Sequence, residues 1–417
     1  MGRTLIKRLR DAVDAKLRKE QAGFRSGRST TEQIFILRNI IEQSLEWNTS
    51  VYLTFIDYEK AFDSIHRATL WKIMKHYGIP EKMITIIKAF YKDNKVAVIN
   101  GPSLSEWFDV KSGVKQGCVM SGFLFLLVID WIMSKAVSGR TGLQWSMMEQ
   151  LEDLDYADDL VSISSTPTHA QQKLDKITRY SSETGLKINV KKTKVIRINA
   201  QLNNALTTSG TVIEDVVSYT YLRGIVTKTG GTSEDIQSRI WKARIAFYKL
   251  NKVWTSNSYH RATKIRIFKS NVISVLMYGS ECWRMTKDDE HRVDTFVHKC
   301  LRRILHIYWP MKVTNEEVRR RANIELISDL IRVRRWRWIG HVLRSPASSH
   351  QRVALTWTPA HGKRRRGKPK ETWRRTAERE RMRMGITSWG AAGALASDCG
   401  GWRTLVSGPI LHRESRT

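Results

Sequence analysis

Residues 151–164 read Leu-Glu-Asp-Leu-Asp-Tyr-Ala-Asp-Asp-Leu-Val-Ser-Ile-Ser, and this stretch decides the fold. Two short apolar runs, around 151–156 and 160–164, flank the residues Ala157, Asp158 and Asp159. Short apolar runs separated by a tight polar turn predict a β-hairpin. The hairpin would carry two adjacent carboxylates at its tip.

A third carboxylate follows another predicted strand. Residues 51–56 are almost all β-branched, aromatic or leucine, which is typical of a strand in a covered sheet, and Asp57 comes directly after them. Upstream, apolar side chains at three-to-four spacing predict an amphipathic helix over 31–47. Asp57 and the Asp158–Asp159 pair could therefore gather at one point of a sheet.

Carboxylates held so close repel one another unless cations separate them. Hard oxygen ligands without neighbouring His or Cys suit Mg²⁺, for which Mn²⁺ can substitute. Two such ions about 4 Å apart can activate an attacking hydroxyl and stabilise a leaving phosphate. This chemistry is nucleotidyl transfer. A bare Asp-Asp pair is more often a turn or a solvated acidic patch, so the surrounding motifs must decide.

The charge of the chain favours a polyanionic partner. Its 417 residues include 71 Lys and Arg against 40 Asp and Glu, a net charge of +31, and 41% are hydrophobic. That apolar content is enough for two or three domains with buried cores. No apolar run approaches the roughly 18 residues of a membrane-spanning helix. Nucleic acid is therefore favoured over a membrane surface.

Cysteine spacing and the N-terminus bear on the compartment. None of the four cysteines lies two to four residues from another, so neither a zinc knuckle nor a disulfide framework is supported. The first ten residues alternate basic and apolar side chains and lack the apolar core of a secretory signal. We expect an intracellular protein. The basic run 363–370 would bind nucleic acid or direct import to the nucleus after cytoplasmic passage, unless it is a plain disordered tail.

Four segments, in order, resemble the motifs of reverse transcriptases from non-LTR (LINE-type, RTE-like) retrotransposons. They are QAGFRSGR at 21–28, FIDYEKAFD at 55–63, GVKQGC at 113–118 and YADD at 156–159. Downstream, residues 185–194 resemble the family's next palm motif and residues 219–222 its primer grip. The resemblance spans roughly residues 10–345, and the basic tail is also similar to that of LINE-type elements.

The resemblance implies roles for the matching acidic residues. Asp57 and Asp158 would be the principal ligands of two Mg²⁺ ions, the backbone carbonyl of Tyr58 would be a further ligand, and Asp159 would support the site. The implied reaction is RNA-directed DNA synthesis, in which a primer 3′-OH attacks a deoxynucleoside triphosphate. The implied partners are an RNA template, a DNA primer or target, and dNTPs.

Other matching residues would handle the nucleotide. Phe62 would lie under the sugar and exclude a ribose 2′-OH, unless it is a core aromatic. Gln116 and Gly117 would line the pocket of the incoming nucleotide, since glycine lets the backbone approach closely; otherwise Gly117 only serves a turn. Lys192 or Lys194 would protonate the departing pyrophosphate, with a solvated strand-edge lysine as an equal alternative.

Two arginines lie in the first motif, and two positions of the chain depart from the family pattern. Arg25 and Arg28 would contact template phosphates, or would mark an ordinary exposed loop. Where the family continues with Pro-Leu-Ser-Pro, this chain has Val-Met-Ser-Gly at 119–122. Arg223 stands before Gly224 where the family has glycine directly after the primer-grip leucine. The first departure lies in the expected nucleotide pocket, and the second lies beside the expected primer grip.

The implied fold is α+β, a right-hand polymerase with fingers and an antiparallel palm sheet, followed by a helical thumb and a basic tail. We expect partial, N-terminally truncated fingers over 1–50, the palm with the catalytic motifs over 51–230, and a helical thumb or connection over 231–345. Residues 346–417 would be a basic, partly disordered nucleic-acid-binding tail. We expect no N-terminal endonuclease domain in this chain.

Two rival interpretations share this fold. One is a catalytically inactive nucleic-acid-binding remnant, and the other is a group II intron maturase-like or telomerase-like polymerase. Residues 331–380 hold 15 Lys and Arg against three Glu, with Trp336 and Trp338 among the arginines. The tryptophans could stack on bases. Helical spacing favours packing in a thumb core instead.

Overall fold

The computed structural model divides the chain into two compact units. It describes residues 2–137, 139–200, 204–364, 366–367 and 369–408. The first unit contains Met1–Gln33, Trp47–Leu222 and Trp357–Arg364, and the second contains Ile34–Glu46, Arg223–Thr356 and Arg365–Thr417. Helix α2 (Thr30–Trp47) thus lies mainly in the second unit. The fold is α+β, as the sequence predicts.

A five-stranded sheet forms the centre of the first unit, with strand order β15-β12-β1-β10-β9. Its strands are β1 (Val51–Ile56), β9 (Asp153–Tyr156), β10 (Asp159–Ser164), β12 (Lys194–Ile198) and β15 (Glu214–Asp215). Strand β1 is central and pairs antiparallel with both β10 and β12, whereas β12 and β15 are parallel. All six residues of β1 are buried, which explains its unbroken apolar sequence.

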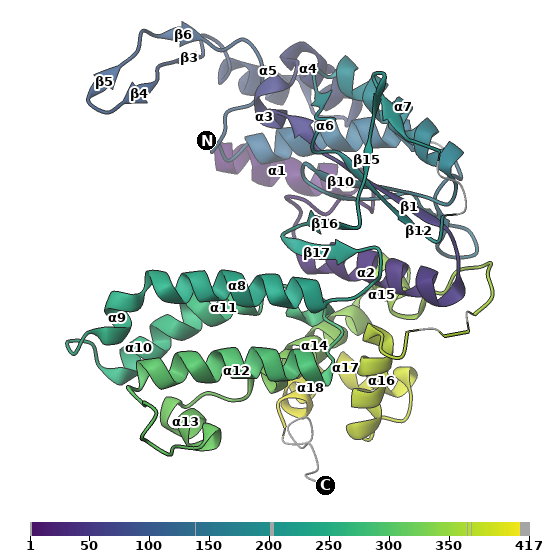
Figure 1. The fold of residues 1–417 in the computed structure, drawn as a ribbon. Coiled ribbons are helices and arrows are strands. Elements are labelled where there is room, and N and C mark those ends of the chain that lie inside the picture. The colour runs from purple at the N-terminus through teal and green to yellow at the C-terminus, as the bar shows by residue number, and fades with distance from the viewer. Residues whose placement is uncertain (1, 138, 201–203, 365, 368, 409–417) are drawn as a thin grey trace. The chain divides into compact units, whose positions relative to one another are not determined.

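Helices α6 (Ser121–Ala136) and α7 (Pro167–Glu183) pack against each other, and α7 contacts β10 (Figure 1). Residues 123–129 of α6 are apolar and buried, because this helix runs through the core of the unit. Helix α7 begins where the Thr166 side chain accepts a hydrogen bond from the His169 amide and Pro167 occupies the first turn.

Shorter elements complete the first unit. Its other helices are α1 (Gly2–Asp14), α3 (Ala61–Ser64), α4 (Arg67–His76) and α5 (Glu81–Ala89). Its other strands are β2 (Tyr58–Glu59), β3 (Lys95–Val96), β4 (Ile99–Asn100), β5 (Ser103–Leu104), β6 (Phe108–Asp109), β7 (Leu143–Gln144), β8 (Gln150–Leu151), β11 (Lys187–Ile188), β13 (Thr207–Thr208), β14 (Thr211–Val212) and β16 (Ser218–Tyr221).

The second unit is almost entirely helical. Besides β17 (Gly224–Thr227), it contains α8 (Ser233–Lys249), α9 (Asn251–Thr255), α10 (Arg261–Phe268), η1 (Lys269–Ile273), α11 (Ser274–Leu276), η2 (Ser280–Cys282), α12 (Lys287–Ile304), α13 (Asn315–Ala322), α14 (Ile327–Arg344), α15 (His350–Thr356), α16 (Trp373–Arg383), α17 (Trp389–Ser397) and α18 (Cys399–Val406). Helix α12 begins at a capping box formed by Thr286 and Asp289. None of the described helices combines the length and the apolar character needed to cross a lipid bilayer.

The segment expected to be a partly disordered tail is largely helical where the structure describes it. Helices α15 to α18 occupy much of residues 350–406, and Trp373 and Trp402 are fully buried in them. The sequence prediction missed these helices because basic residues dominate 363–383 and because Gly, Ala and Ser dominate 388–401. Of the basic run 363–370, Arg365 and Lys368 lie outside the described residues, as do 409–417. Nuclear import by this run remains a prediction.

Candidate active site

The predicted hairpin is present and its turn is tight. Tyr156 pairs with Asp159, so only Ala157 and Asp158 connect β9 to β10. Ala157 is buried and adopts a left-handed conformation with φ 58°, while Asp158 is exposed. The turn therefore presents the Asp158 side chain to solvent at the end of the sheet.

The strand register brings Asp57 to the same place. In the antiparallel pair of β1 and β10, Ile56 lies opposite Leu160, so the next position of the ladder sets Asp57 beside Asp159. Desolvation raises the pKa of Asp57, and the charge of Asp158 raises it further, against the opposing effect of Lys192. Partial desolvation and the charges of Asp158 and Asp57 raise the pKa of Asp159 to about 6, although this residue is exposed. The three carboxylates therefore lie within electrostatic reach of one another.

Of the two candidate lysines, Lys192 lies at this cluster. Its Nζ is 3.6 Å from Oδ1 of Asp57, and its side chain is otherwise exposed. Lys194 begins β12 and forms a salt bridge with Glu214, with Nζ and Oε2 2.5 Å apart. The proton-donor role remains a prediction, and the geometry favours Lys192 for it.

The donor atoms at the cluster fit a hard divalent cation. Oδ1 of Asp57 is buried and, apart from its 3.6 Å ion pair with Lys192, has no hydrogen-bond partner among the described residues. The Asn189 amide donates to the Asp57 carbonyl, so the alternation of the β2–β11 ladder directs the next carbonyl, that of Tyr58, away from β11. Within the described ranges, no group of three or more His, Cys, Asp or Glu side chains is already arranged as a metal centre. The oxygen donors at the cluster, carboxylates and a carbonyl, are of the kind that Mg²⁺ prefers.

The segment with the nucleotide-pocket motif is fastened to the helix that carries Phe62. The Val114 amide donates to the Phe62 carbonyl over 2.7 Å, and the Gly113 amide donates to the Ile65 carbonyl over 2.8 Å. A Cβ on Gly113, whose φ is +72°, would lie 2.6 Å from the Asp63 backbone. This position therefore requires glycine.

Phe62, Gln116 and Gly117 thus belong to one neighbourhood. The half-buried Phe62 ring stacks on Phe125 with centroids 4.5 Å apart, so one of its faces is a core contact. Gln116 and Gly117 are exposed, and Gly117 has φ +81° with open space around its Cα. Because the Cys118 amide bonds back to Lys115, glycine serves a turn here; the nucleotide contact of Gln116 and Gly117 remains a prediction.

Arg25 has a structural role. Its guanidinium donates to both carboxylate oxygens of Asp14, at 2.7 and 3.1 Å, and to the carbonyls of Arg18 and Gln21. Only 8% of the side chain is exposed. These bonds occupy the groups that a template phosphate would need, so the predicted phosphate contact has no support in this conformation.

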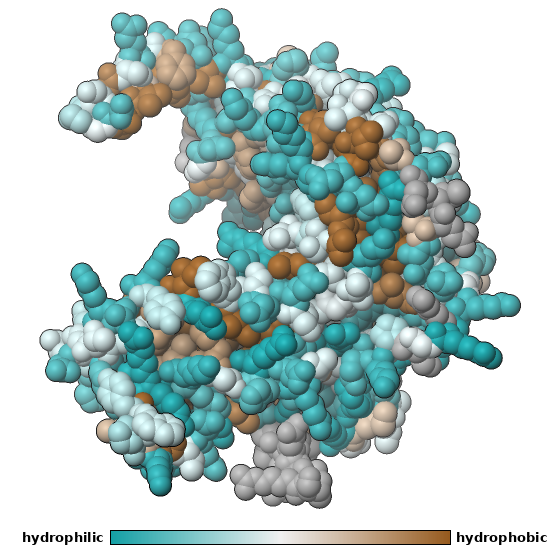
Figure 2. Space-filling model, viewed as in Figure 1, coloured by the Kyte–Doolittle hydropathy of each residue, from teal (hydrophilic) through white to brown (hydrophobic). Residues whose placement is uncertain are grey.

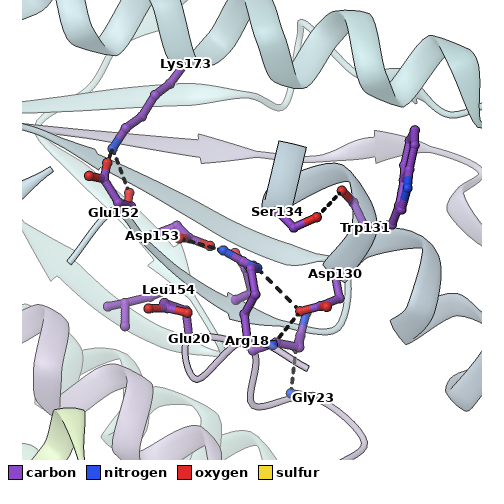
Figure 3. A network of polar contacts seen from close by, with 12 residues as sticks. Arg18, Glu20, Gly23, Asp130, Trp131, Ser134, Glu152, Asp153, Leu154 and Lys173 are labelled. Carbon is purple, nitrogen blue, oxygen red and sulfur yellow. Dashed lines mark hydrogen bonds and ion pairs between the residues drawn. The ribbon is translucent and has the colours of Figure 1, made fainter. Parts of the chain in front are cut away.

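A buried polar network beneath the hairpin was not predicted from the sequence. The Arg18 guanidinium bonds to both carboxylate oxygens of Asp153, at 2.9 and 2.8 Å, and also contacts Asp155. The Arg18 amide donates to Asp130 on α6. Figure 3 shows Arg18 reaching between Asp130 and Asp153, with Lys173 bonded to Glu152 nearby.

The network is strongly coupled electrostatically. Burial alone would lower the pKa of Arg18, but the charges of Asp153 and Asp155 raise it well above its usual value. Burial and the charge of Asp153 raise the pKa of Asp155. Both aspartates lie on β9, the strand that leads into the Asp158 turn. The only sequence signal for this network is the pair of acids Asp153 and Asp155, two residues apart. That pair does not indicate that Arg18 is their partner.

Tyr219, in the predicted primer grip, also lies near the carboxylates. Its ring stacks on Phe55 of β1 with centroids 4.2 Å apart. Desolvation, followed by the charges of Asp159 and Asp57, raises its pKa to about 12. The grip segment is therefore anchored to the strand that ends at Asp57.

In the second unit, the arginine-rich helix α14 mostly pairs with acids. Arg332 bonds to Asp329 and Glu290, and the buried Arg335 pairs with Glu380. Trp336 and Trp338, on the same helix, are buried. The core interpretation of the tryptophans is confirmed, and these two arginines are not free for phosphates.

Cations that form no salt bridge among the described residues line a groove between α8 and α12. The groove has a volume of about 580 Å³. Its floor includes Ile240, Phe247 and Phe296, and its cationic lining residues are Arg244, Arg292, Lys299 and Arg303. Figure 2 shows apolar surface between hydrophilic residues in this region. No acidic side chain lines the groove, and among the described residues none of its arginines or its lysine forms a salt bridge.

Several known proteins are similar to parts of this chain. A family model described as reverse transcriptase (RNA-dependent DNA polymerase) matches residues 1–230, and a domain family of unknown function matches residues 246–278. An uncharacterized transposon-derived protein of Caenorhabditis elegans is 27% identical over 264 residues, which cover 61% of this chain and 91% of that protein. A Pol polyprotein from the retrotransposable element R2 of Popillia japonica is 23% identical, with 76% of this chain and 45% of the polyprotein covered. Telomerase from Candida tropicalis gives a TM-score of 0.44 at 13% identity, with 85% of this chain and 56% of that chain covered.

Proposed function

The chain belongs to the reverse transcriptase family and resembles the members found in non-LTR retrotransposons, and from this premise we propose that it is an RNA-directed DNA polymerase. The chain spans nearly all of the nematode relative but less than half of the beetle polyprotein, so the proposal concerns polymerisation alone. One observation carries it. Strand register gathers Asp57 with the Asp158–Asp159 pair, and Lys192 lies 3.6 Å from the first of them.

Asp57, Asp158 and the Tyr58 carbonyl would hold Mg²⁺, and Asp159 would support the site. Bound Mg²⁺ would activate the primer 3′-OH and stabilise the leaving pyrophosphate. The raised pKa of Asp159, about 6, leaves its carboxyl mostly ionised at neutral pH and therefore able to complement a cation. Burial of β1 keeps Asp57 in place because every residue before it on that strand is packed.

Lys192 would hold the proton that the pyrophosphate takes on leaving. A flexible, exposed ammonium beside a metal-binding carboxylate can follow the phosphate as charge develops there. Phe62 would select deoxynucleotides, because its ring is fixed by stacking on Phe125 and cannot move aside for a 2′-OH. Gln116 and Gly117 lie in the segment fastened to the Phe62 helix and would line the same nucleotide pocket.

The proposal is tested by incorporation of labelled dTTP on poly(rA) primed with oligo(dT), in Mg²⁺. We expect activity from the natural chain and a loss of at least about a hundredfold in Asp158→Ala, since removal of a ligand that stabilises developing charge costs rate on that order. A matched control is Asp11→Ala, which removes an exposed carboxylate from α1. If Asp158→Ala retained the activity of Asp11→Ala, the proposal would fail.

A second function, nucleic-acid binding without catalysis, is favoured by the groove between α8 and α12. Four exposed cations, Arg244, Arg292, Lys299 and Arg303, line it without acidic neighbours. Arg303 also lies over the ring of Tyr248, 5.9 Å from its centroid, which offers a flat cationic and aromatic surface to a base. The groove would bind an RNA backbone whether or not the cluster of Asp57, Asp158 and Asp159 is catalytically active.

This function predicts a change in salt dependence. Each lost phosphate contact reduces the slope of log affinity against log salt by about 0.7 for single strands. Replacing Arg244, Arg292 and Lys299 by Gln should therefore flatten the slope by about 2. The control replaces three exposed lysines of the first unit, Lys72, Lys82 and Lys92. Equal slopes for the two triple variants would refute a specific role for the groove.

A further inference from the structure

The stretch from Glu20 to Gly23 runs alongside β9. The Asp155 amide donates to the Glu20 carbonyl over 3.3 Å, and the Ala22 amide donates to the Asp155 carbonyl over 2.8 Å. Gln21 and Asp155 form a parallel bridge. The segment therefore extends the sheet beside the strand that leads into the Asp158 turn.

The Gln21 side chain connects this segment to the Ala157–Asp158 turn by hydrogen bonds. Gln21 is fully buried, and its Oε1 accepts hydrogen bonds from the Gly23 amide at 2.8 Å and the Ala157 amide at 3.2 Å. Ala157 immediately precedes Asp158 and has a left-handed backbone. One oxygen atom thus ties two backbone segments that are more than a hundred residues apart.

Gly23 makes the approach possible. A Cβ at this position would lie 2.1 Å from the Ala157 nitrogen and 2.7 Å from its Cα. Real Cβ atoms do not come so close to a backbone, so any side chain at 23 would push the two segments apart. Glycine is required here for lack of space, not for an unusual φ.

We infer that Gln21 and Gly23 are positioning residues that hold the turn and thereby place the Asp158 carboxylate for metal binding. This inference rests on the proposed function. A left-handed conformation at a residue with a side chain is unfavourable and persists only where surrounding contacts impose it. The hydrogen bond from Ala157 to Gln21 and the close packing of Gly23 supply those contacts.

The position uses glutamine as an acceptor. Its Nε2 has no hydrogen-bond partner among the described residues, so only Oε1 contributes to holding the turn. Glutamate keeps an acceptor oxygen at the same reach, whereas methionine keeps the length and loses the acceptor. Gln21→Glu and Gln21→Met therefore form a matched pair that separates hydrogen bonding from packing.

The test measures Mn²⁺ binding by electron paramagnetic resonance of the free ion, with Asp158→Ala marking the signal that belongs to this site. Gln21→Met should weaken Mn²⁺ binding about tenfold, as expected when a buried amide loses its acceptor. It should lower kcat for dTTP incorporation with KM for dTTP within about twofold of the natural chain. Gln21→Glu should restore both to within about threefold. Gly23→Ala should behave like Gln21→Met.

Equal impairment of the glutamate and methionine variants would overturn the inference, and so would natural Mn²⁺ binding by a folded Gln21→Met protein. If both Gln21→Met and Gly23→Ala fail to fold, amide hydrogen exchange of the natural chain decides. The Ala157 amide should exchange at least about a hundredfold more slowly than that of Asp158, and comparable rates would refute the inference. Should the natural chain bind Mn²⁺ but incorporate no dTTP, the proposed function fails while the Mn²⁺ comparison still tests Gln21.

Discussion

Arg18 is the cation on which the acidic interior beneath the hairpin depends. It bonds twice to Asp153 and contacts Asp155, and its amide donates to Asp130 (Figure 3). The side chains of the three aspartates are at most 1% exposed. The substitution Arg18→Met keeps the length of the side chain and removes its charge, so three buried carboxylates would lose their shared partner.

The expected cost follows from this geometry. Removing one member of a buried ion pair typically destabilises a protein by about 3–5 kcal/mol, because the other charge stays buried and uncompensated. The Arg18 guanidinium serves three carboxylates, since its Nε also lies 3.4 Å from Oδ1 of Asp130, and this argues for the upper end, about 5 kcal/mol. A domain is stable by only about 5–15 kcal/mol in total, so the first unit of the variant would be marginal.

The loss of stability in Arg18→Met should depend on pH, and the direction of this dependence follows from the shifts in pKa. Burial already raises the pKa values of Asp130 and Asp155 in the folded chain, and Arg18 opposes this. Without Arg18 these values rise further above those of the unfolded chain, so the folded variant binds more protons than the unfolded one. Its stability therefore falls as pH rises. The gap between variant and natural chain should be widest above pH 7 and should narrow towards pH 5.

Urea unfolding at pH 5, 6, 7 and 8, followed by far-UV circular dichroism, measures this. The control is Arg179→Met, which removes an exposed arginine beside Glu183 and should cost no more than about 1 kcal/mol at any pH. A pH-independent difference, or a loss at pH 7 no larger than that of the control, would refute the view that Arg18 neutralises this interior.

Three further predictions follow from single positions. Burial raises the pKa of Glu42 to about 7, above its unfolded value of about 4.5, so the natural chain loses stability as pH rises through this window. Glu42→Gln keeps an acceptor for the Trp373 amide and should stabilise the second unit by about 2 kcal/mol at pH 8 and hardly at all at pH 5, as measured by thermal unfolding. Arg223 is exposed and has φ +65°, so Arg223→Gly should relieve left-handed strain and raise stability by about 1 kcal/mol; a lower melting temperature would contradict this. Phe62→Val should raise UTP incorporation relative to dTTP by about 10–200-fold, the range expected from reshaping an apolar pocket, and an unchanged ratio would remove Phe62 from sugar selection.

The elements that carry the carboxylates could be predicted from sequence because their signals are local. The strand Val51–Ile56 is an unbroken apolar run, and the hairpin is two such runs around a two-residue turn. Each carboxylate sits at the end of one of these patterns, so finding the strand also locates the acid. The family resemblance then implied an antiparallel sheet that carries Asp57 and Asp158, which periodicity alone does not give, and the pairing of the individual strands came from the structure.

Long-range partners could not be predicted in this way. The choice between Lys192 and Lys194 depends on the parallel pairing of β12 with β15, which sets Glu214 beside Lys194 and leaves Lys192 to Asp57. Arg18 looks like any other residue of a basic N-terminal segment until β9 and α6 fold around it. Gln21 was noticed only as part of a motif, and its contact with the Ala157 turn depends on a chain separation of 136 residues.

In the second unit, the density of basic residues in the sequence was a poor guide to the nucleic-acid-binding surface, for a physical reason. A buried arginine must be paired, so acids scattered through the sequence are drawn to it, as Glu380 is to Arg335 and Glu290 to Arg332. Density of basic residues along the chain therefore does not locate a phosphate-binding surface. Exposed cations without acidic neighbours are the better guide, and four of them, Arg244, Arg292, Lys299 and Arg303, line the α8–α12 groove for which we propose nucleic-acid binding. Nucleic-acid contacts should consequently follow unpaired charge, and the salt slope of the groove variant measures that charge directly.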